Sequence, residues 1–314
     1  MPKPRRPRMK TTAAAILCLL CAVTRLHAQD LEPRAYAASP VGANFLILGL
    51  SRSSGAIVFD PSLPISDVHA DVNGLVLGLG HTFSLFGKLG LVTAAMPYVL
   101  AHATGKVSET DAEIHRSGLA DSRFKLSVNL RGNDAMAIGD FVKAPSRTIV
   151  GASVVVTAPS SQYSSRKLIN LGTNRWSVKP EVGIAVPRGR WDFDAYAGAW
   201  FYSENPDFYP GGKRRSQDPV VTLQGHVSYT FRPRLWVAGD WTWYHGGSST
   251  VEDGTPSSSL NNARGGVTVS LPIGSRYSLK AAYTSGIVAR TGTNFRTVSV
   301  SWQALWLSRR LSGL

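Results

Sequence analysis

The chain has 314 residues, 43% of them hydrophobic, and its 34 basic and 20 acidic residues give a formal net charge of +14. The positive charge is spread along the chain with no run longer than Lys213-Arg214-Arg215, whereas nucleic-acid-binding proteins concentrate it on one face or arm. This distribution excludes nucleic acid as an expected partner. No segment after residue 28 is apolar for long enough to be a transmembrane helix.

The first 28 residues resemble a secretory signal peptide. A basic start, MPKPRRPRMK, precedes the uncharged run TTAAAILCLLCAVT, and the small residue Ala28 marks a cleavage point. We therefore expect a signal peptide over 1–28 and a single exported domain over 29–314. Both cysteines, Cys18 and Cys21, would be removed, which excludes disulfides and thiolate metal sites from the mature protein.

Apolar and polar side chains alternate through the rest of the chain. In RFKLSVNL at 123–130, Phe124, Leu126 and Val128 alternate with polar residues, and successive side chains of a strand point to opposite faces. The same pattern predicts twelve strands, each long enough to cross a bilayer when tilted. They are 43–51, 70–83, 89–102, 120–131, 147–158, 175–186, 190–202, 219–231, 234–245, 262–271, 276–289 and 295–306.

The links between these strands alternate in length. Those after the second, sixth, eighth and tenth strands are tight, while those after the first, third, fifth, seventh and ninth are long and polar. Short periplasmic turns and long outer loops are typical of an outer-membrane barrel. The longer link at 132–146 predicts either a small plug or a short periplasmic helix. The sequence thus indicates an all-β fold, a closed antiparallel transmembrane barrel in the bacterial outer membrane.

Aromatic residues gather at the strand ends, as expected for side chains that prefer the headgroup level. On the apolar wall we place Phe83, Trp191, Phe193, Tyr229, Phe231 and Trp306 near the periplasmic rim, and Trp176, Phe201, Trp243 and Phe295 near the outer rim.

Several stretches are similar to one known family. FDPSLPISD (59–67), GLADSRFKLSVNL (118–130), KLINLGTNRWSVKPEVG (167–183) and DPVVTLQGHVSYTFRPRLWVAGDWTWY (218–244) resemble the outer-membrane family of the meta-pathway of phenol degradation, whose members are often named transporter. The resemblance covers nearly all of the mature chain. It implies an outer-membrane barrel that admits hydrophobic or aromatic small molecules, and it transfers no catalytic residues.

The polar wall carries charged residues that we expect to line the lumen. Opposite charges facing one another could form a selective constriction, or they could simply fill a salt-bridged interior. These residues are Arg123, Lys125, Lys179, Glu181, Asp192, Asp194, Asp240, Arg264 and Lys280.

Other candidate chemistry is weak. His226 and Ser228 share a face, but a nucleophile and base also need an orienting partner, so an interior polar row is the preferred interpretation. Asp192 and Asp194 are too few ligands for calcium, and the seven histidines show no spacing typical of metal ligands. We expect no catalytic residue, metal or cofactor.

These patterns predict a channel for passive uptake of small molecules rather than an enzyme. The alternatives are an outer-membrane lipid hydrolase and a structural or adhesive barrel that acts through its long loops. The expected partners are membrane lipids, lipopolysaccharide, the outer-membrane assembly machinery and an unidentified small solute.

Overall fold

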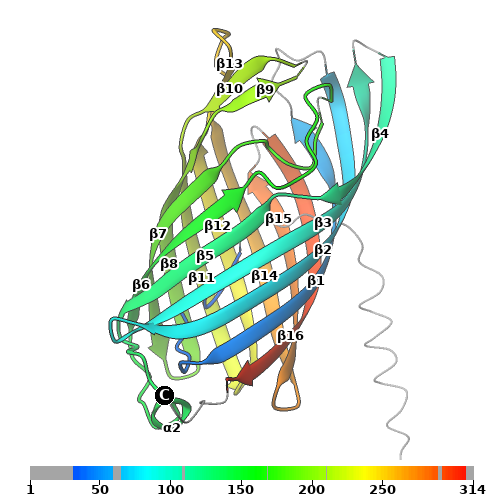
Figure 1. Ribbon diagram of the computed structural model, residues 1–314. Coiled ribbons are helices and arrows are strands. Elements are labelled where there is room, and N and C mark those ends of the chain that lie inside the picture. The colour runs from blue at the N-terminus through cyan, green and yellow to red at the C-terminus, as the bar shows by residue number, and fades with distance from the viewer. Residues whose placement is uncertain are drawn as a thin grey trace, which may run out of the picture.

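Alternation of side chains along each strand gives this chain one closed antiparallel sheet (Figure 1). The computed structural model describes residues 31–58, 65–107, 110–167, 169–209, 211–288 and 292–308. The predicted signal peptide at 1–28 lies outside the described residues. No helix in the described ranges is long and apolar enough to cross a bilayer.

Twelve strands form the barrel wall, and every neighbouring pair is antiparallel. One of the twelve is interrupted. β4 pairs with residues 98–107 of β3, and β5 pairs with residues 90–95 of β3, nearer the tight turns. The ring closes through β1, which pairs with both β2 and β16, and through the pairing of β2 with β3. The strands are β1 (Ala43–Val58), β2 (Ile65–Leu85), β3 (Lys88–Val107), β4 (Thr110–Leu119), β5 (Ser122–Arg131), β6 (Ile149–Ala158), β7 (Ser177–Arg188), β8 (Trp191–Tyr202), β11 (Val220–Arg232), β12 (Leu235–Gly246), β14 (Leu260–Ile273), β15 (Tyr277–Val288) and β16 (Gly292–Leu307).

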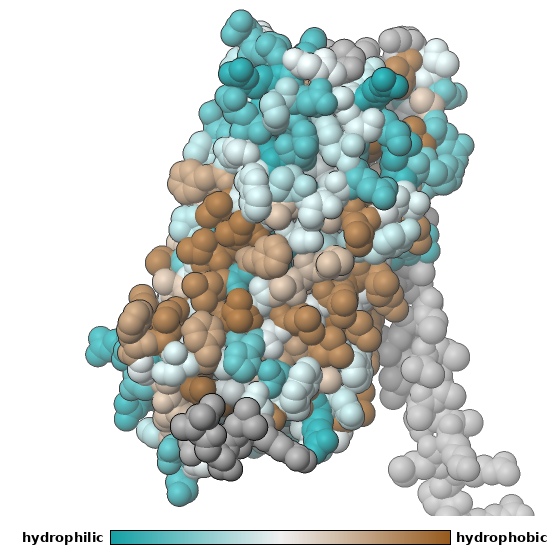
Figure 2. All heavy atoms as spheres, in the orientation of Figure 1, coloured by the Kyte–Doolittle hydropathy of each residue, from teal (hydrophilic) through white to brown (hydrophobic). Residues whose placement is uncertain are grey.

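The apolar wall faces outward. On β11, Val221, Leu223 and Val227 are exposed, whereas the intervening Gln224 and His226 are buried. Figure 2 shows the consequence on the visible face as a band of hydrophobic side chains across the lower and middle part of the barrel, with hydrophilic side chains above it. A closed barrel leaves no unpaired strand edge in lipid, so an outward apolar band is the arrangement that a bilayer requires.

The four tight turns lie where the sequence predicts them, at the same end of the barrel as the start of β1. The link between β5 and β6 contains a short helix, α2 (Ile138–Phe141), which confirms one of the two predicted structures for this segment. Next to it, Lys88 Nζ lies 2.6 Å from Asp134 Oδ1, and this bond to a cation lowers the pKa of the Asp134 carboxyl.

Two predictions about the outer end were wrong. The links after the first and third strands are not long loops, because β1, β2 and β3 continue past the predicted ends and β4 pairs with β3 as an extended hairpin. The other error is Phe295, which is 1% exposed and packs inward against Val68, Ala70 and Ala103 instead of facing lipid.

The outer loops carry their own sheet. It consists of three short strands in the order β13 (Ser249–Val251), β10 (Lys213–Gln217) and β9 (Asn205–Phe208), at the top of Figure 1. The basic run 213–215 is part of β10. The N–H of Gly212 donates to Asp207 Oδ1 at 2.7 Å, and this bond, helped by the Ser165 hydroxyl, lowers the pKa of the Asp207 carboxyl.

Candidate functional site

The lumen holds the segment 31–42, which precedes β1. The segment joins the barrel wall at the end with the tight turns, where the N–H of Gly42 donates to the carbonyl of Thr82 at 2.9 Å. From there it runs back into the barrel, and Glu32 reaches Lys125 on β5 with an ion pair of 2.7 Å. The alternation of side chains did not reveal this segment, because the segment is irregular.

Arg34 is the most heavily bonded residue of the segment. Its backbone N–H donates to Asp194 Oδ2 at 3.0 Å, and its side chain forms an ion pair with Asp192. Its Nε also donates to Ser228 Oγ at 2.9 Å. Hydrogen bonds between a guanidinium and carboxylates are among the stronger ones in proteins, so β8 and β11 hold this part of the segment firmly.

Tyr36 fills a slot in the barrel wall. Its ring is 1% exposed and lies over Gly151 on β6 and Gly183 on β7, where an added Cβ would come within 2.2 and 2.3 Å of ring atoms. Its hydroxyl donates to Ser153 Oγ at 3.1 Å or Glu181 Oε1 at 3.3 Å. The ring therefore fits only because both wall positions lack a side chain.

A second charge cluster lies beside Tyr36. Lys179 Nζ and Glu181 Oε2 are 2.8 Å apart, and their side chains are only 5% and 3% exposed. Gln224 Nε2 also donates to Glu181 Oε2 at 3.3 Å. Burial of a carboxylate is costly unless it is paired and hydrogen-bonded, and Glu181 is satisfied on both counts.

The segment 31–42 lies between two cavities. The inner cavity, on the side of the tight turns, has a volume of about 290 Å³. It is lined by Arg34, Ala37 and Ala38 together with the link 132–147. The outer one has a volume of about 140 Å³ and is lined by Glu32 and Ala35 together with wall residues. A solute that crosses the barrel through the lumen must pass this segment.

The charged residues predicted for the lumen all point into the barrel. Lys179, Glu181, Asp194, Asp240 and Arg264 are buried there. Arg123 and Lys125 line the outer cavity, Asp192 lines the inner cavity, and the Lys280 ammonium lies 5.6 Å from the ring of interior Trp236. Arg264 donates to the carbonyl of Phe295 at 2.9 Å, which ties β14 to β16. The structure thus brings Lys125, Asp192 and Asp194 together with Glu32 and Arg34, which the sequence did not suggest. Arg264 lies apart from this group.

The pair His226 and Ser228 has an orienting group but not a hydrolase geometry. His226 Nδ1 lies 2.7 Å from Asp240 Oδ1, with both side chains fully buried. In the described part of the chain, however, His226 Nε2 has no hydrogen-bond partner, and the Ser228 hydroxyl is bonded by Arg34. A nucleophile–base pair requires a hydrogen bond between the base and the nucleophile. Here the serine hydroxyl is bonded by Arg34 and not by His226.

The outer mouth carries a loop whose described residues are 159–167 and 169–176. The Asp121 carboxylate accepts hydrogen bonds from the backbone N–H of Ser161 at 3.2 Å and from both the N–H and the hydroxyl of Thr173, at 2.9 and 3.0 Å. Gly172 is required here, because an added Cβ would lie 1.6 Å from Ser161 Oγ. The stretch INLGTNRW at 169–176 therefore has a structural role as part of a loop anchored to the wall.

Residues 53–302 match the model of a protein family described as "Putative MetA-pathway of phenol degradation". The chain belongs to this family. This family member is also similar to a solved outer membrane channel, the COG4313 channel from Pseudomonas putida F1, with 22% identity and a TM-score of 0.75. That alignment covers 88% of this chain and 100% of the other. It supports the fold of the barrel.

Other solved barrels are less similar. The transport unit of the autotransporter AIDA-I from Escherichia coli aligns at 10% identity with a TM-score of 0.48, covering 97% of this chain and 100% of the other. The TodX monoaromatic hydrocarbon channel aligns at 11% identity with a TM-score of 0.43, covering 85% and 90%. Comparison with curated proteins gives no match.

Proposed function

We propose that this protein is an outer-membrane channel through which small neutral molecules, among them single-ring aromatic compounds, diffuse passively. Membership of the phenol-degradation family and the outward apolar band support this function. The observation that carries it is the pair of lumen cavities on either side of residues 31–42. In the same proposal, residues 1–28 act as a cleaved signal peptide for export.

The sizes of the cavities fit such solutes. An apolar protein cavity of about 150 Å³ is large enough to hold benzene. The inner cavity, at about 290 Å³, is larger than this, and the outer one, at about 140 Å³, is comparable. Each cavity can therefore accommodate one aromatic ring, and neither can accommodate a large solute without movement of the wall or of the segment.

The charges of the interior favour neutral solutes. The basic and acidic side chains inside the barrel nearly balance, and three basic ones, Arg34, Lys125 and Lys179, are each paired with an acidic side chain at less than 3 Å. Paired charges cancel at a distance, so they present neither a strongly positive nor a strongly negative constriction. The basic residues are Arg34, Arg123, Lys125, Lys179, Arg264 and Lys280, and the acidic ones are Glu32, Glu181, Asp192, Asp194 and Asp240.

The experiment compares cells that carry the protein with otherwise identical cells that lack it. Uptake of labelled phenol, benzoate and a disaccharide is measured at solute concentrations low enough for outer-membrane passage to limit the rate. Intact cells are preferable to liposomes, because neutral aromatic compounds cross simple phospholipid bilayers unaided. We expect the protein to accelerate phenol uptake, with a smaller effect on benzoate and none on the disaccharide. Equal phenol uptake in both strains would refute the proposal.

The lipid-hydrolase alternative makes a different prediction. It requires activity that depends on Ser228, whereas a channel does not use this hydroxyl as a nucleophile. Ser228→Ala should therefore leave phenol uptake within about twofold of wild type, because it removes one hydrogen bond to Arg34 of several. Phospholipid hydrolysis by wild type that disappears in Ser228→Ala would favour the enzyme.

A further inference from the structure

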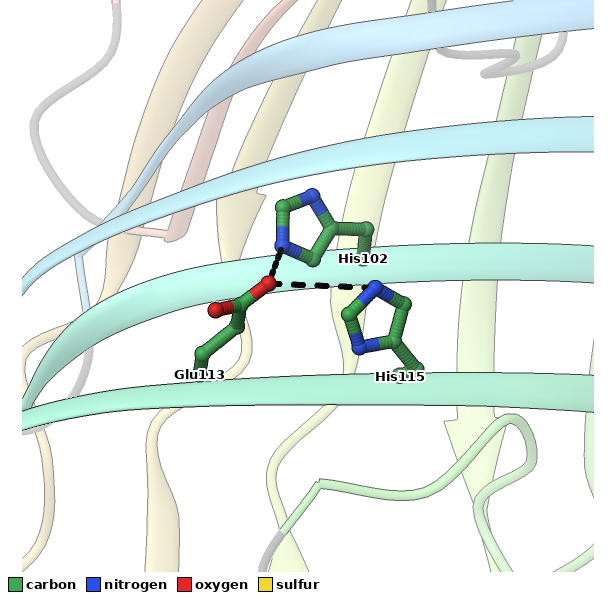
Figure 3. A group of neighbouring side chains, drawn as sticks. All are labelled: His102, Glu113 and His115. Carbon is green, nitrogen blue, oxygen red and sulfur yellow. Dashed lines mark hydrogen bonds and ion pairs between the residues drawn. The ribbon is translucent and has the colours of Figure 1, made fainter.

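Two histidines and a glutamate meet on the outer face of the β3–β4 hairpin (Figure 3). His102 on β3 stands directly opposite His115 on β4, and their rings stack with centroids 4.5 Å apart. Glu113 is two residues from His115 and therefore shares its face of the sheet. Spacing along the sequence gives no sign of this cluster, because the antiparallel register creates it.

The three side chains direct their ligand atoms toward one point. Glu113 Oε1 lies 2.7 Å from His102 Nε2 and 3.8 Å from His115 Nε2, and all three atoms are within 4.8 Å of one another. Around a tetrahedral Zn²⁺ with bonds of about 2.1 Å, neighbouring ligand atoms are about 3.4 Å apart. Small side-chain rotations bring the three atoms to this spacing without any change in the backbone.

The surroundings suit a cation that remains open to solvent. The three side chains are 40%, 59% and 74% exposed, so a metal can reach them and a water molecule can complete its coordination. On the neighbouring strand β2, Asp71 is opposite His102 and adds a carboxylate to the same row. Two imidazoles and one carboxylate with an open fourth position are a ligand set that zinc uses in proteins.

From this geometry we propose that His102, Glu113 and His115 form a binding site for a divalent transition-metal ion of the Zn²⁺ type. The bound ion joins β3 to β4 above the apolar band, where β4 pairs with no strand other than β3 in the described part of the chain. It therefore acts as a cross-link within the β3–β4 hairpin. This site is separate from the lumen, and its presence does not depend on the proposed channel function.

The test uses the full-length protein, purified in detergent without a polyhistidine tag and treated with a chelator. Zn²⁺ is titrated by calorimetry, and Co²⁺ is added separately because its visible spectrum reports a four-coordinate site. We expect one Zn²⁺ per chain, with the affinity at least tenfold lower in His102→Ala and in His115→Ala. The same substitutions should abolish the Co²⁺ bands. His245→Ala is the matched control, since His245 is an exposed histidine near the outer end of β12.

The outcome decides the proposal even if an alanine variant folds poorly. Glu113→Gln keeps the size of the side chain and removes its charge, and it should also weaken Zn²⁺ binding at least tenfold. Folding of every variant is checked by the heat-dependent gel mobility typical of outer-membrane barrels. No binding by wild type, or identical isotherms for wild type, His102→Ala and Glu113→Gln, would overturn the proposal.

Discussion

Glu32 and Lys125 form an ion pair of 2.7 Å across 93 residues of sequence. The contact links the segment before β1 to the middle of β5 inside the barrel. With the bonds of Arg34 and Tyr36, it places residues 31–42 across the lumen between two cavities.

Removing the positive charge of Arg34 should change ion selectivity. Arg34→Ala leaves the Asp192 carboxylate without its cationic partner and removes a positive charge from beside Asp194, whose hydrogen bond from the backbone N–H of residue 34 is kept. Facing acidic groups attract cations, so we expect a severalfold increase in the permeability ratio of K⁺ to Cl⁻. The measurement is the reversal potential in planar bilayers under a salt gradient. Arg188→Ala, at the exposed end of β7, is the control and should behave like wild type.

The slot for Tyr36 can be tested by filling it. Gly183→Ala places a methyl group where the Tyr36 ring lies, and overpacking of this kind costs about 1–3 kcal/mol unless the ring leaves the slot. Tyr36→Phe keeps the ring and loses only hydroxyl hydrogen bonds, at a cost of about 1 kcal/mol. We expect Gly183→Ala to lower the midpoint of thermal unfolding more than Tyr36→Phe does. The reverse order would show that the hydroxyl, rather than the fit of the ring, holds the segment.

The buried pair of Lys179 and Glu181 should show strong coupling. Lys179→Met leaves the buried Glu181 carboxylate without its cation. We expect the free energy of unfolding to fall by about 3 kcal/mol, at the lower end of the usual range, because the adjacent cavity can admit water. The double variant Lys179→Met/Glu181→Met removes both charges and should recover most of this loss. Denaturant unfolding in detergent measures both values. If the two substitutions lowered the free energy of unfolding additively, the result would contradict a coupled pair.

Asp121 should hold the outer loop that contains Ser161 and Thr173. Asp121→Ala removes the acceptor for Ser161 and Thr173, which frees the loop from the barrel wall. Trypsin should then cut after Arg166 or Lys167, both exposed, at least severalfold faster than in wild type. Asp253→Ala changes an exposed carboxylate in another outer loop and serves as the control. Equal cleavage rates in wild type and Asp121→Ala would mean that other contacts hold the loop.

Much of the barrel could be predicted from the sequence because a strand with lipid on one side and polar groups on the other must alternate. That rule gave the outward position of Leu223 and the inward position of Glu181. The same rule places Phe295 inside, on the face of the buried Thr297, and the error came from grouping Phe295 with the aromatic residues of the apolar wall.

The parts of the candidate site that could not be predicted depend on contacts between distant segments. Residues 31–42 are irregular, so no periodicity marks them as part of the lumen. The interior glycines Gly151 and Gly183 were the available signal, because a small residue in a strand often marks close approach of another group. The pairing of His102 with His115 similarly depends on the register between β3 and β4, which their alternating patterns do not fix.

The central claim is that residues 31–42 restrict a conducting lumen. The most direct measurement is the single-channel conductance of wild type and of a variant that lacks residues 31–41, with folding of both confirmed by heat-dependent gel mobility. Loss of the segment would join the two cavities, so the conductance of the variant should be at least twofold higher than that of wild type. Equal conductance in the two proteins would contradict the account.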